Sequence, residues 1–200
     1  MPVMHIHYPS GALDASQKST LAGRLTDVLL DMEGGAQTDG GRAFATVLFT
    51  PVASGDWWVG GRDDESYVSP PGRFLIRVSI PEGYMDQRHK SSVHRAVADA
   101  ICDVHGRAGD PKLGANILVT IEEVTEGNWG AAGRTISLAS IAETVGLSKT
   151  SDRFRWVLEY FAAKARVFRA AGYPAGAGGL LPTALETSDT SAGASSVDSR

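Results

Sequence analysis

The stretches SGDWWVGGR (residues 54–62) and EGNWGAAGR (residues 126–134) are two copies of one pattern. Both contain a glycine, a tryptophan, a second glycine and a closing arginine at the same spacing. The offset is 72 residues (126 − 54), and carrying it outward aligns residues 2–62 with 74–134 without a gap. About sixteen of about sixty aligned positions are identical, which indicates an internal duplication.

Each copy follows the order strand, helix, strand. It opens with a stretch in which apolar and polar residues alternate (PVMHIHY, then FLIRVSI), as in a half-buried strand. A Pro-x-Gly turn and an aspartate, Asp14 or Asp86, then precede apolar residues at helical spacing, so the aspartate is predicted to cap a helix. Glycine-rich segments end both helices. The second strands are expected at 43–52 and 116–124.

These two units predict an α/β fold. A right-handed crossover makes the two strands of each β-α-β unit parallel. Two units side by side therefore predict a four-stranded mixed sheet with two helices on one face. Residues 63–73 are polar and proline-rich, which is typical of a linker, so we predict one duplicated domain over residues 2–134.

The pattern changes after residue 134. Residues 135–172 are predicted to form a helical extension, with a short helix in SLASIAETVG and a longer one that begins at Ser151 or Asp152. From residue 173 to 200 the chain is rich in glycine, alanine, serine and threonine and poor in large apolar residues. This composition predicts a disordered tail.

Composition points to a soluble globular protein. The formal net charge of −4 argues against a polyanion-binding protein as a whole, although it leaves room for a local basic patch. The single cysteine forms no disulfide framework, and the sequence contains neither a secretory signal pattern nor a run of eighteen apolar residues. We therefore expect a cytoplasmic protein with no membrane association.

The N-terminal proline, the Pro-x-Gly turn, the helix and the glycine- and tryptophan-bearing hairpin together resemble the tautomerase superfamily. That family includes 4-oxalocrotonate tautomerase, macrophage migration inhibitory factor, malonate semialdehyde decarboxylase and cis-3-chloroacrylic acid dehalogenase. The resemblance covers about residues 2–134 and is greatest for members with two β-α-β units per chain. It implies a homotrimer that acts on a small carbonyl compound or unsaturated acid; we predict no cofactor.

In that family the N-terminal proline is catalytic, and the resemblance carries this role to Pro2. Once Met1 is removed, Pro2 is a secondary amine at the chain end. An α-amino group has a reference pKa of about 7.7–8.0, and burial or nearby cations lower it, so Pro2 is suited to act as a general base. It is also a candidate acid or nucleophile. The equivalent residue of the second unit, Phe74, has no free amine, which leaves one candidate site per chain.

The chain departs from the family at its carboxylate clamp. Members that act on carboxylates hold them with arginines at the turn after the first strand and on the second strand. At the turn this chain has Ala12 and Tyr84. On the strand it has Thr46 and Leu118. The sequence therefore predicts a tautomerase-like fold without the family's usual clamp.

Other side chains are candidates for holding a substrate, because arginine binds carboxylates in bidentate fashion, tryptophan forms pocket walls, and asparagine and threonine bond to oxygen. The predicted substrate-binding residues are Arg134, Trp129, Arg62, Trp57, Arg77, Asn116 and Thr120. Solvated loop arginines and plain hairpin packing are the structural alternatives. His5 and His7 share a strand face, but two ligands make no zinc site, so no metal is predicted.

Residues 137–158 have the cadence of a bacterial helix-turn-helix, with Gly146 at the turn. Residues 148–169 carry six Lys/Arg against two acidic residues, the charge sign that a phosphate-facing helix needs. A DNA-binding regulator is thus one alternative to the enzyme. A catalytically silent tautomerase fold used for assembly is another, with the helical extension packed on the trimer rim. We favour the enzyme.

Overall fold

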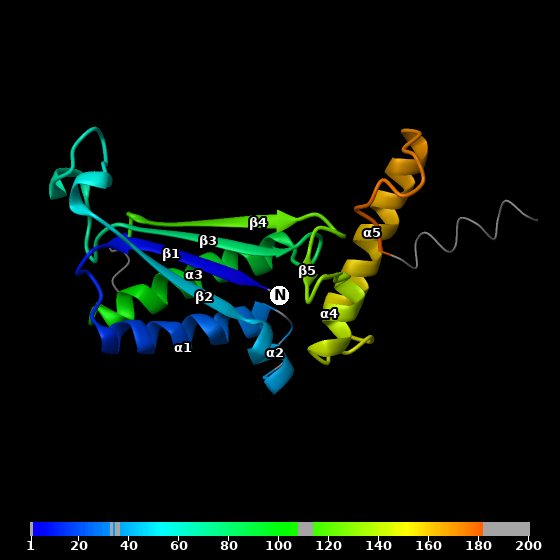
Figure 1. The fold of residues 1–200 in the computed structure, drawn as a ribbon, viewed down its shortest axis with the longest axis horizontal. Coiled ribbons are helices and arrows are strands. Elements are labelled where there is room, and N and C mark those ends of the chain that lie inside the picture. The colour runs from blue at the N-terminus through cyan, green and yellow to red at the C-terminus, as the bar shows by residue number, and fades with distance from the viewer. Residues whose placement is uncertain (1, 33, 35–36, 108–113, 182–200) are drawn as a thin grey trace, which may run out of the picture.

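The computed structural model describes residues 2–32, 34, 37–107 and 114–181, and its main element is a four-stranded mixed sheet (Figure 1). The strands are β1 (Val3–Pro9), β2 (Thr46–Val52), β3 (Phe74–Pro81) and β4 (Ile117–Val124), in the order β2-β1-β3-β4. β1 and β2 are parallel, as are β3 and β4, whereas β1 and β3 are antiparallel. The predicted sheet of two β-α-β units is confirmed.

Two long helices cover one face of this sheet, α1 (Ala15–Met32) and α3 (Gln87–Val104) (Figure 1). Their bounds differ by 72 residues at both ends (87 − 15 and 104 − 32), which is the offset of the sequence repeat. Asp86 caps α3 by accepting a bond of 2.8 Å from the backbone N–H of His89. Asp14 and Gln17 form a reciprocal capping box at the start of α1.

The core lies between the sheet and these helices, because successive side chains of a strand point to opposite faces. The helix-facing residues of β1 and β3 are buried, namely Met4, Ile6, Tyr8, Phe74, Ile76, Val78 and Ile80. They pack against leucines of α1 and against valines and an isoleucine of α3. No helix of the described chain covers the other face, on which Leu48 and Leu118 are 44% and 57% exposed.

A short helix, α2 (Asp39–Phe44), precedes β2. The prediction of a strand from residue 43 was therefore wrong for its first three residues. The Oγ1 of Thr38 accepts a bond of 3.0 Å from the N–H of Gly41 and so caps this helix. The local cap, and not the apolar pattern that continues into β2, determines where the strand begins.

Each second strand is followed by a hairpin. After β2 come a 3-10 helix, η1 (Ser54–Asp56), and a bridge between Val59 and Arg62; after β4 come β5 (Gly130–Ala131) and β6 (Arg134–Thr135). Because the two units run in opposite directions, the hairpins lie at opposite ends of the sheet (Figure 1). A second 3-10 helix, η2 (Glu65–Tyr67), lies in the linker beside the first hairpin.

The helical extension consists of α4 (Leu138–Thr144) and α5 (Asp152–Ala170), capped by Ser137 and Ser151 as their N-cap residues. Both helices stand at the end of the sheet where β1 begins and β3 and β4 end (Figure 1). Val157 and Phe161 of α5 are buried in the common core. Within the described segments, no helix is both long and apolar enough to cross a membrane.

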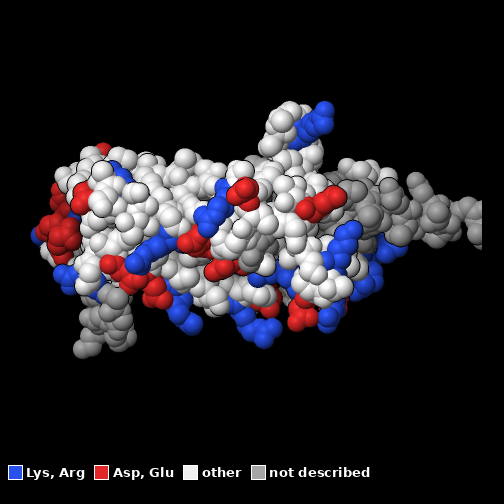
Figure 2. Space-filling model, turned by 90° about the horizontal axis from the view of Figure 1, so that it is seen from below, with Lys and Arg blue, Asp and Glu red and all other residues white. Residues whose placement is uncertain are grey.

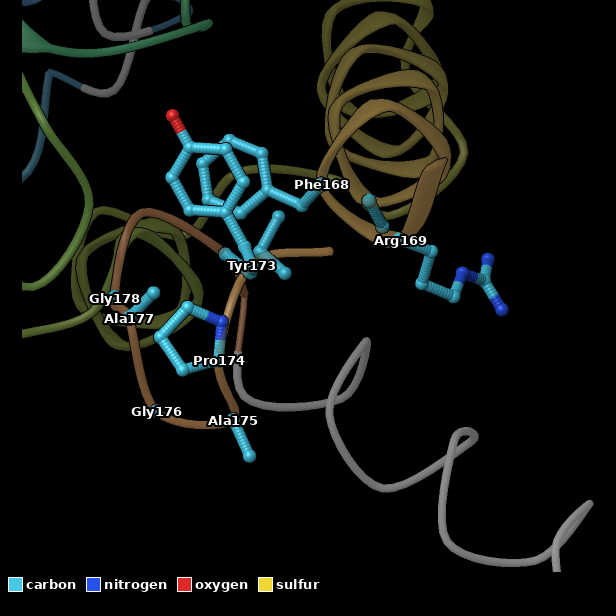
Figure 3. Close-up of a pocket in the computed structure, with 10 residues that line it drawn as sticks. Phe168, Arg169, Tyr173, Pro174, Ala175, Gly176, Ala177 and Gly178 are labelled. Carbon is cyan, nitrogen blue, oxygen red and sulfur yellow. The ribbon is translucent and has the colours of Figure 1, made fainter. Parts of the chain in front are cut away.

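The chain after α5 folds back along it. Tyr173 stacks on Phe168 with ring centroids 4.4 Å apart (Figure 3). Gly179 donates a backbone bond of 3.0 Å to the carbonyl of Glu126, and Leu181 is buried. The prediction of disorder from residue 173 is therefore wrong for 173–181, and the remainder of the predicted tail, 182–200, lies outside the described residues.

Candidate active site at the Pro2 end of the sheet

Pro2 is buried at the start of β1. Its carbonyl oxygen accepts a bond of 3.2 Å from the N–H of Thr46 in β2, while the next residue, Val3, pairs with Ser79 near the end of β3. A proline is tolerated there because the first residue of a strand need not donate to the ladder. The second hairpin follows β4 at this same end, so Pro2 and the hairpin share one end of the molecule (Figure 1).

The second hairpin carries two polar groups that have no hydrogen-bond or ion-pair partner among the residues that the structure describes. It surrounds a shallow hollow of about 530 Å³, lined by residues 127–135. The indole Nε1 of Trp129 is buried and has no hydrogen-bond partner among the described residues. Leaving a buried donor without a hydrogen bond costs about 1–3 kcal/mol of folding free energy. The indole N–H is therefore a candidate to donate to a ligand. Arg134 is exposed and forms no ion pair with any residue that the structure describes.

The first hairpin uses its arginine internally. Arg62 donates to the carboxylate of Asp64 from Nε at 3.0 Å and from Nη2 at 2.7 Å. These bonds hold the pKa of Asp64 well below its usual range and raise the pKa of Arg62. The residue equivalent to Asp64 in the second unit is Ile136 (64 + 72), so Arg134 lacks this partner.

A buried arginine also ties the first hairpin to the linker. The guanidinium of Arg73, which is 5% exposed, donates to the carbonyl of Trp57, to that of Asp63 at 2.9 Å and to the carboxylate of Glu65 at 2.6 Å. Trp57 is half-buried in this arrangement. Its hairpin is thus held as part of the scaffold, at the end of the sheet away from Pro2.

Arg77 and Thr120 lie on the open face of the sheet. Arg77 donates to Oε1 of Glu122 from Nε at 2.9 Å and from Nη2 at 2.7 Å. The hydroxyl of Thr120 donates to the carbonyl of Ile76 at 3.5 Å. Both side chains therefore bond to neighbouring strands of their own chain.

Asn116 fastens the linker. Its Oδ1 accepts a bond of 2.7 Å from the N–H of Ser69, and its Nδ2 donates to the carbonyl of Tyr67 at 3.4 Å. Of the predicted substrate-binding residues, Trp129 and Arg134 are thus the two whose element lies at the Pro2 end. The others are at the opposite end or on the open face, namely Arg62, Trp57, Asn116, Arg77 and Thr120.

A polar cluster at the Pro2 end was not predicted. Glu82, the residue after β3, accepts two bonds of 2.6 Å from Nζ of Lys164 and one of 2.8 Å from the hydroxyl of Tyr160. Burial opposes the ionisation of Glu82, but these two donors outweigh it and lower its pKa. Burial and the Glu82 carboxylate raise the pKa of Tyr160 to about 12. The sequence carries no local signal of this cluster, because its members are far apart in the chain.

Glu126 lies next to this cluster and is 5% exposed. Both of its carboxylate oxygens accept bonds of 3.1 Å from the N–H of Leu138 at the start of α4. Burial raises the pKa of Glu126, and the nearby charge of Glu82 adds to this effect. The carboxyl group of Glu126 thus joins the second hairpin to the extension, although burial and the charge of Glu82 both disfavour its ionised form.

Some of the cations of the helix-turn-helix-like segment bond to other groups of the protein. Arg153 donates to the carbonyl of Met32, and Lys164 and Arg155 pair with carboxylates of the chain. Three of the six cations in residues 148–169 are therefore held by the protein itself. On the face that carries the long helices, basic and acidic side chains are interspersed (Figure 2). This pattern differs from the continuous basic surface that nucleic-acid binding favours.

No family model and no curated protein matches the sequence. Among solved structures, the chain is similar to a member of the cis-3-chloroacrylic acid dehalogenase family, with 18% identity and a TM-score of 0.55 over 77% of this chain and 97% of that one. It is also similar to native fused 4-OT (22% identity, TM-score 0.53, 66% and 94% covered) and to a wild-type fused 4-OT described as a symmetric trimer (17%, 0.53, 70% and 98%). The chain shares the fold of these structures.

Proposed function

We propose that this protein is a tautomerase-type enzyme that catalyses keto-enol tautomerisation, or a related proton transfer or hydration, on a small carbonyl compound or unsaturated acid. Pro2, freed by removal of Met1, acts as the base and acid. The difference between two equivalent strand starts carries this proposal. Pro2 is a potential amine, buried at the end of the sheet that also bears Trp129 and Arg134, which has no ion pair within the described part of the chain, whereas Phe74 has no amine.

The chemistry needs one proton-transfer group. Burial favours the neutral form of an amine, so Pro2 is suited to remove the hydroxyl proton of an enol. As the carbonyl forms, the electron pair of the carbon–carbon double bond takes a proton at carbon from the prolinium, which returns to the neutral amine. Arg134 would hold a substrate carboxylate, and the indole N–H of Trp129 would donate to a substrate oxygen.

A homotrimer is part of this proposal. The open sheet face exposes one leucine on each edge strand, Leu48 and Leu118, and no helix of the described residues covers it, so this face is available to other chains. A fused 4-OT of the same fold is described as a trimer. Light scattering of the full chain tests this: three chains per particle are expected, and a monomer at working concentration would contradict it.

Exchanging the secondary amine of Pro2 for a primary one tests the enzyme. Pro2→Ala keeps an α-amine but loses the ring that fixes the position of the basic nitrogen, so it should lower kcat/KM for an enol such as phenylenolpyruvate by about a hundredfold or more, on the scale of a general-base contribution. Melting temperature and particle mass should stay near those of the wild type, because the change is at the chain end. Intact mass spectrometry of the wild type should show that Met1 is absent. Undiminished turnover by Pro2→Ala, or an active protein that retains Met1, would rule out the proline mechanism.

A further inference from the structure

The turn after β3, residues 82–84, is contacted at each of its three residues by α5. Glu82, at its first position, lies in a bidentate bridge of 2.6 Å to Lys164 and accepts the Tyr160 hydroxyl. The side chains of Glu82 and Lys164 are 14% and 17% exposed. An ion pair this sheltered from water fixes the relative position of its two elements more firmly than a surface pair does.

Gly83, at the second position, lies directly against the Tyr160 ring. A Cβ on this glycine would be 2.6 Å from the ring atom Cε1, so only glycine permits the contact. Its φ of +71° also favours glycine. The N–H of Gly83 donates to Glu123 at 3.1 Å, which fastens the other side of the turn to β4.

Tyr84, at the third position, lies under Arg153. The guanidinium is 5.3 Å from the centroid of the tyrosine ring, and its Nη1 donates to the Tyr84 carbonyl at 3.4 Å. The same nitrogen donates to the carbonyl of Met32, the last residue of α1, at 2.7 Å. Arg153 thus joins the turn to both α1 and α5.

The three contacting residues of α5 belong to one helical face. Arg153, Tyr160 and Lys164 are spaced seven and four residues apart, which brings them to the same side as the buried Val157 and Phe161. This face therefore combines an apolar anchor with three polar contacts, all of which meet a single turn.

The equivalent turn of the first unit has no such contacts around its glycine. Residues 10–12 correspond to 82–84 at the 72-residue offset, and Gly11 has a similar φ of +84°. Apart from its two chain neighbours, no described residue has an atom within 4 Å of a Cβ built on Gly11. The contact on glycine is thus specific to the turn at the Pro2 end, although the fold of the repeat requires both turns.

We propose that α5 positions the Pro2 site, with Lys164 as a positioning residue that acts through Glu82 to hold the turn 82–84. This rests on the proposed function, because it assigns to the extension the placement of a turn that borders the proposed site. Tyr160 and Arg153 support the same turn at its second and third residues. The extension is then part of the enzyme's working structure, and turnover depends on its contact with the sheet.

Lys164→Met tests the proposal with Arg166→Met as a matched control, since Arg166 is exposed on the same helix. Hydrogen exchange of the amides in residues 82–84 should become at least tenfold faster in Lys164→Met and stay unchanged in Arg166→Met. For phenylenolpyruvate, KM should rise about tenfold in Lys164→Met with kcat changed less than threefold, because Pro2 is untouched. Lys164→Arg keeps the cation and should recover most of both losses.

Unchanged exchange in Lys164→Met would overturn the proposal, as would a faster turn with unaltered KM and kcat. Exchange requires no substrate, so it reports the contact independently of the Pro2→Ala assay. Faster exchange of the turn in Lys164→Met, combined with undiminished turnover by Pro2→Ala, would overturn the link to the Pro2 site. If Lys164→Met fails to fold, Tyr160→Phe removes only the hydroxyl bond to Glu82 and should show the same pattern, with a smaller change, about threefold in exchange and KM.

Discussion

The two ends of the sheet are built from the same repeated unit, yet they differ in where their polar groups are directed. At the Phe74 end, Arg62 is paired with Asp64 and the buried Arg73 holds the hairpin to the linker. At the Pro2 end, Arg134 has no such partner in the described chain, and the support comes from α5. A duplicated unit can therefore be specialised without changing its fold: one copy pairs its hairpin arginine internally, and in the other Arg134 has no ion-pair partner among the described residues.

The two turn glycines give the largest expected effect. Gly83→Ala should destabilise the protein by about 3 kcal/mol or more, because a left-handed conformation and an overlap with the Tyr160 ring both oppose the new methyl. Gly11→Ala meets only the conformational penalty, of about 1–2 kcal/mol. Urea unfolding of both variants measures the difference. Equal losses would mean that α5 does not press on the turn.

The two hairpin arginines come next. Arg134→Ala should lower kcat/KM by roughly tenfold to a hundredfold, because a free guanidinium that holds a substrate carboxylate contributes about 1.4–2.7 kcal/mol on this scale. Arg62→Ala should change kcat/KM less than twofold, since the guanidinium of Arg62 is already in an ion pair with Asp64. Steady-state kinetics on a carboxylate substrate compares the two. Similar losses of kcat/KM in both variants would contradict the proposal that only the arginine at the Pro2 end holds substrate.

Substitution of Glu126 gives the smallest expected effect, and it should stabilise the protein instead of impairing it. Its raised pKa means that folding disfavours its ionised form, so its carboxylate lowers stability above the folded pKa and ceases to do so at lower pH. Glu126→Gln should therefore raise the melting temperature by a few degrees at neutral pH, with one oxygen still accepting from Leu138. The gain should vanish below the ordinary pKa of glutamate, about 4.3.

Glu143→Gln, at an exposed position of α4, serves as the control and should leave the melting temperature unchanged at both pH values. A lower melting temperature for Glu126→Gln at neutral pH would show that its bond to the extension outweighs the effect of burial.

Most of the fold could be predicted from the sequence, because the 72-residue offset sets strand, helix and hairpin in both units at once. The short helix α2 was missed because its cap is a single hydroxyl, that of Thr38, ahead of a pair of glycines that suggest a loop. The order of residues 173–181 depends on contacts of Gly179 and Leu181 with distant parts of the chain. Composition alone does not reveal such contacts.

The candidate site was less predictable than the fold. The equivalence of Arg62 and Arg134 is visible in the sequence, but their difference depends on whether Asp64 reaches the guanidinium, which only the structure shows. The contact of Lys164 with Glu82 joins residues 82 positions apart (164 − 82), and neither lies in a recognisable motif. Pro2 was identified from the resemblance to the tautomerase superfamily, and its catalytic role stays a prediction.

Arg153 has a consequence for how the molecule unfolds. One guanidinium nitrogen bonds both the final carbonyl of α1 and a carbonyl of the turn, and it does so from a helix more than a hundred residues downstream (153 − 32 = 121). Fraying at the end of α1 therefore requires that the bond from Arg153 of α5 to the Met32 carbonyl be broken. We expect the extension and the duplicated domain to melt in a single calorimetric transition, as one cooperative unit, despite being separate segments of the chain.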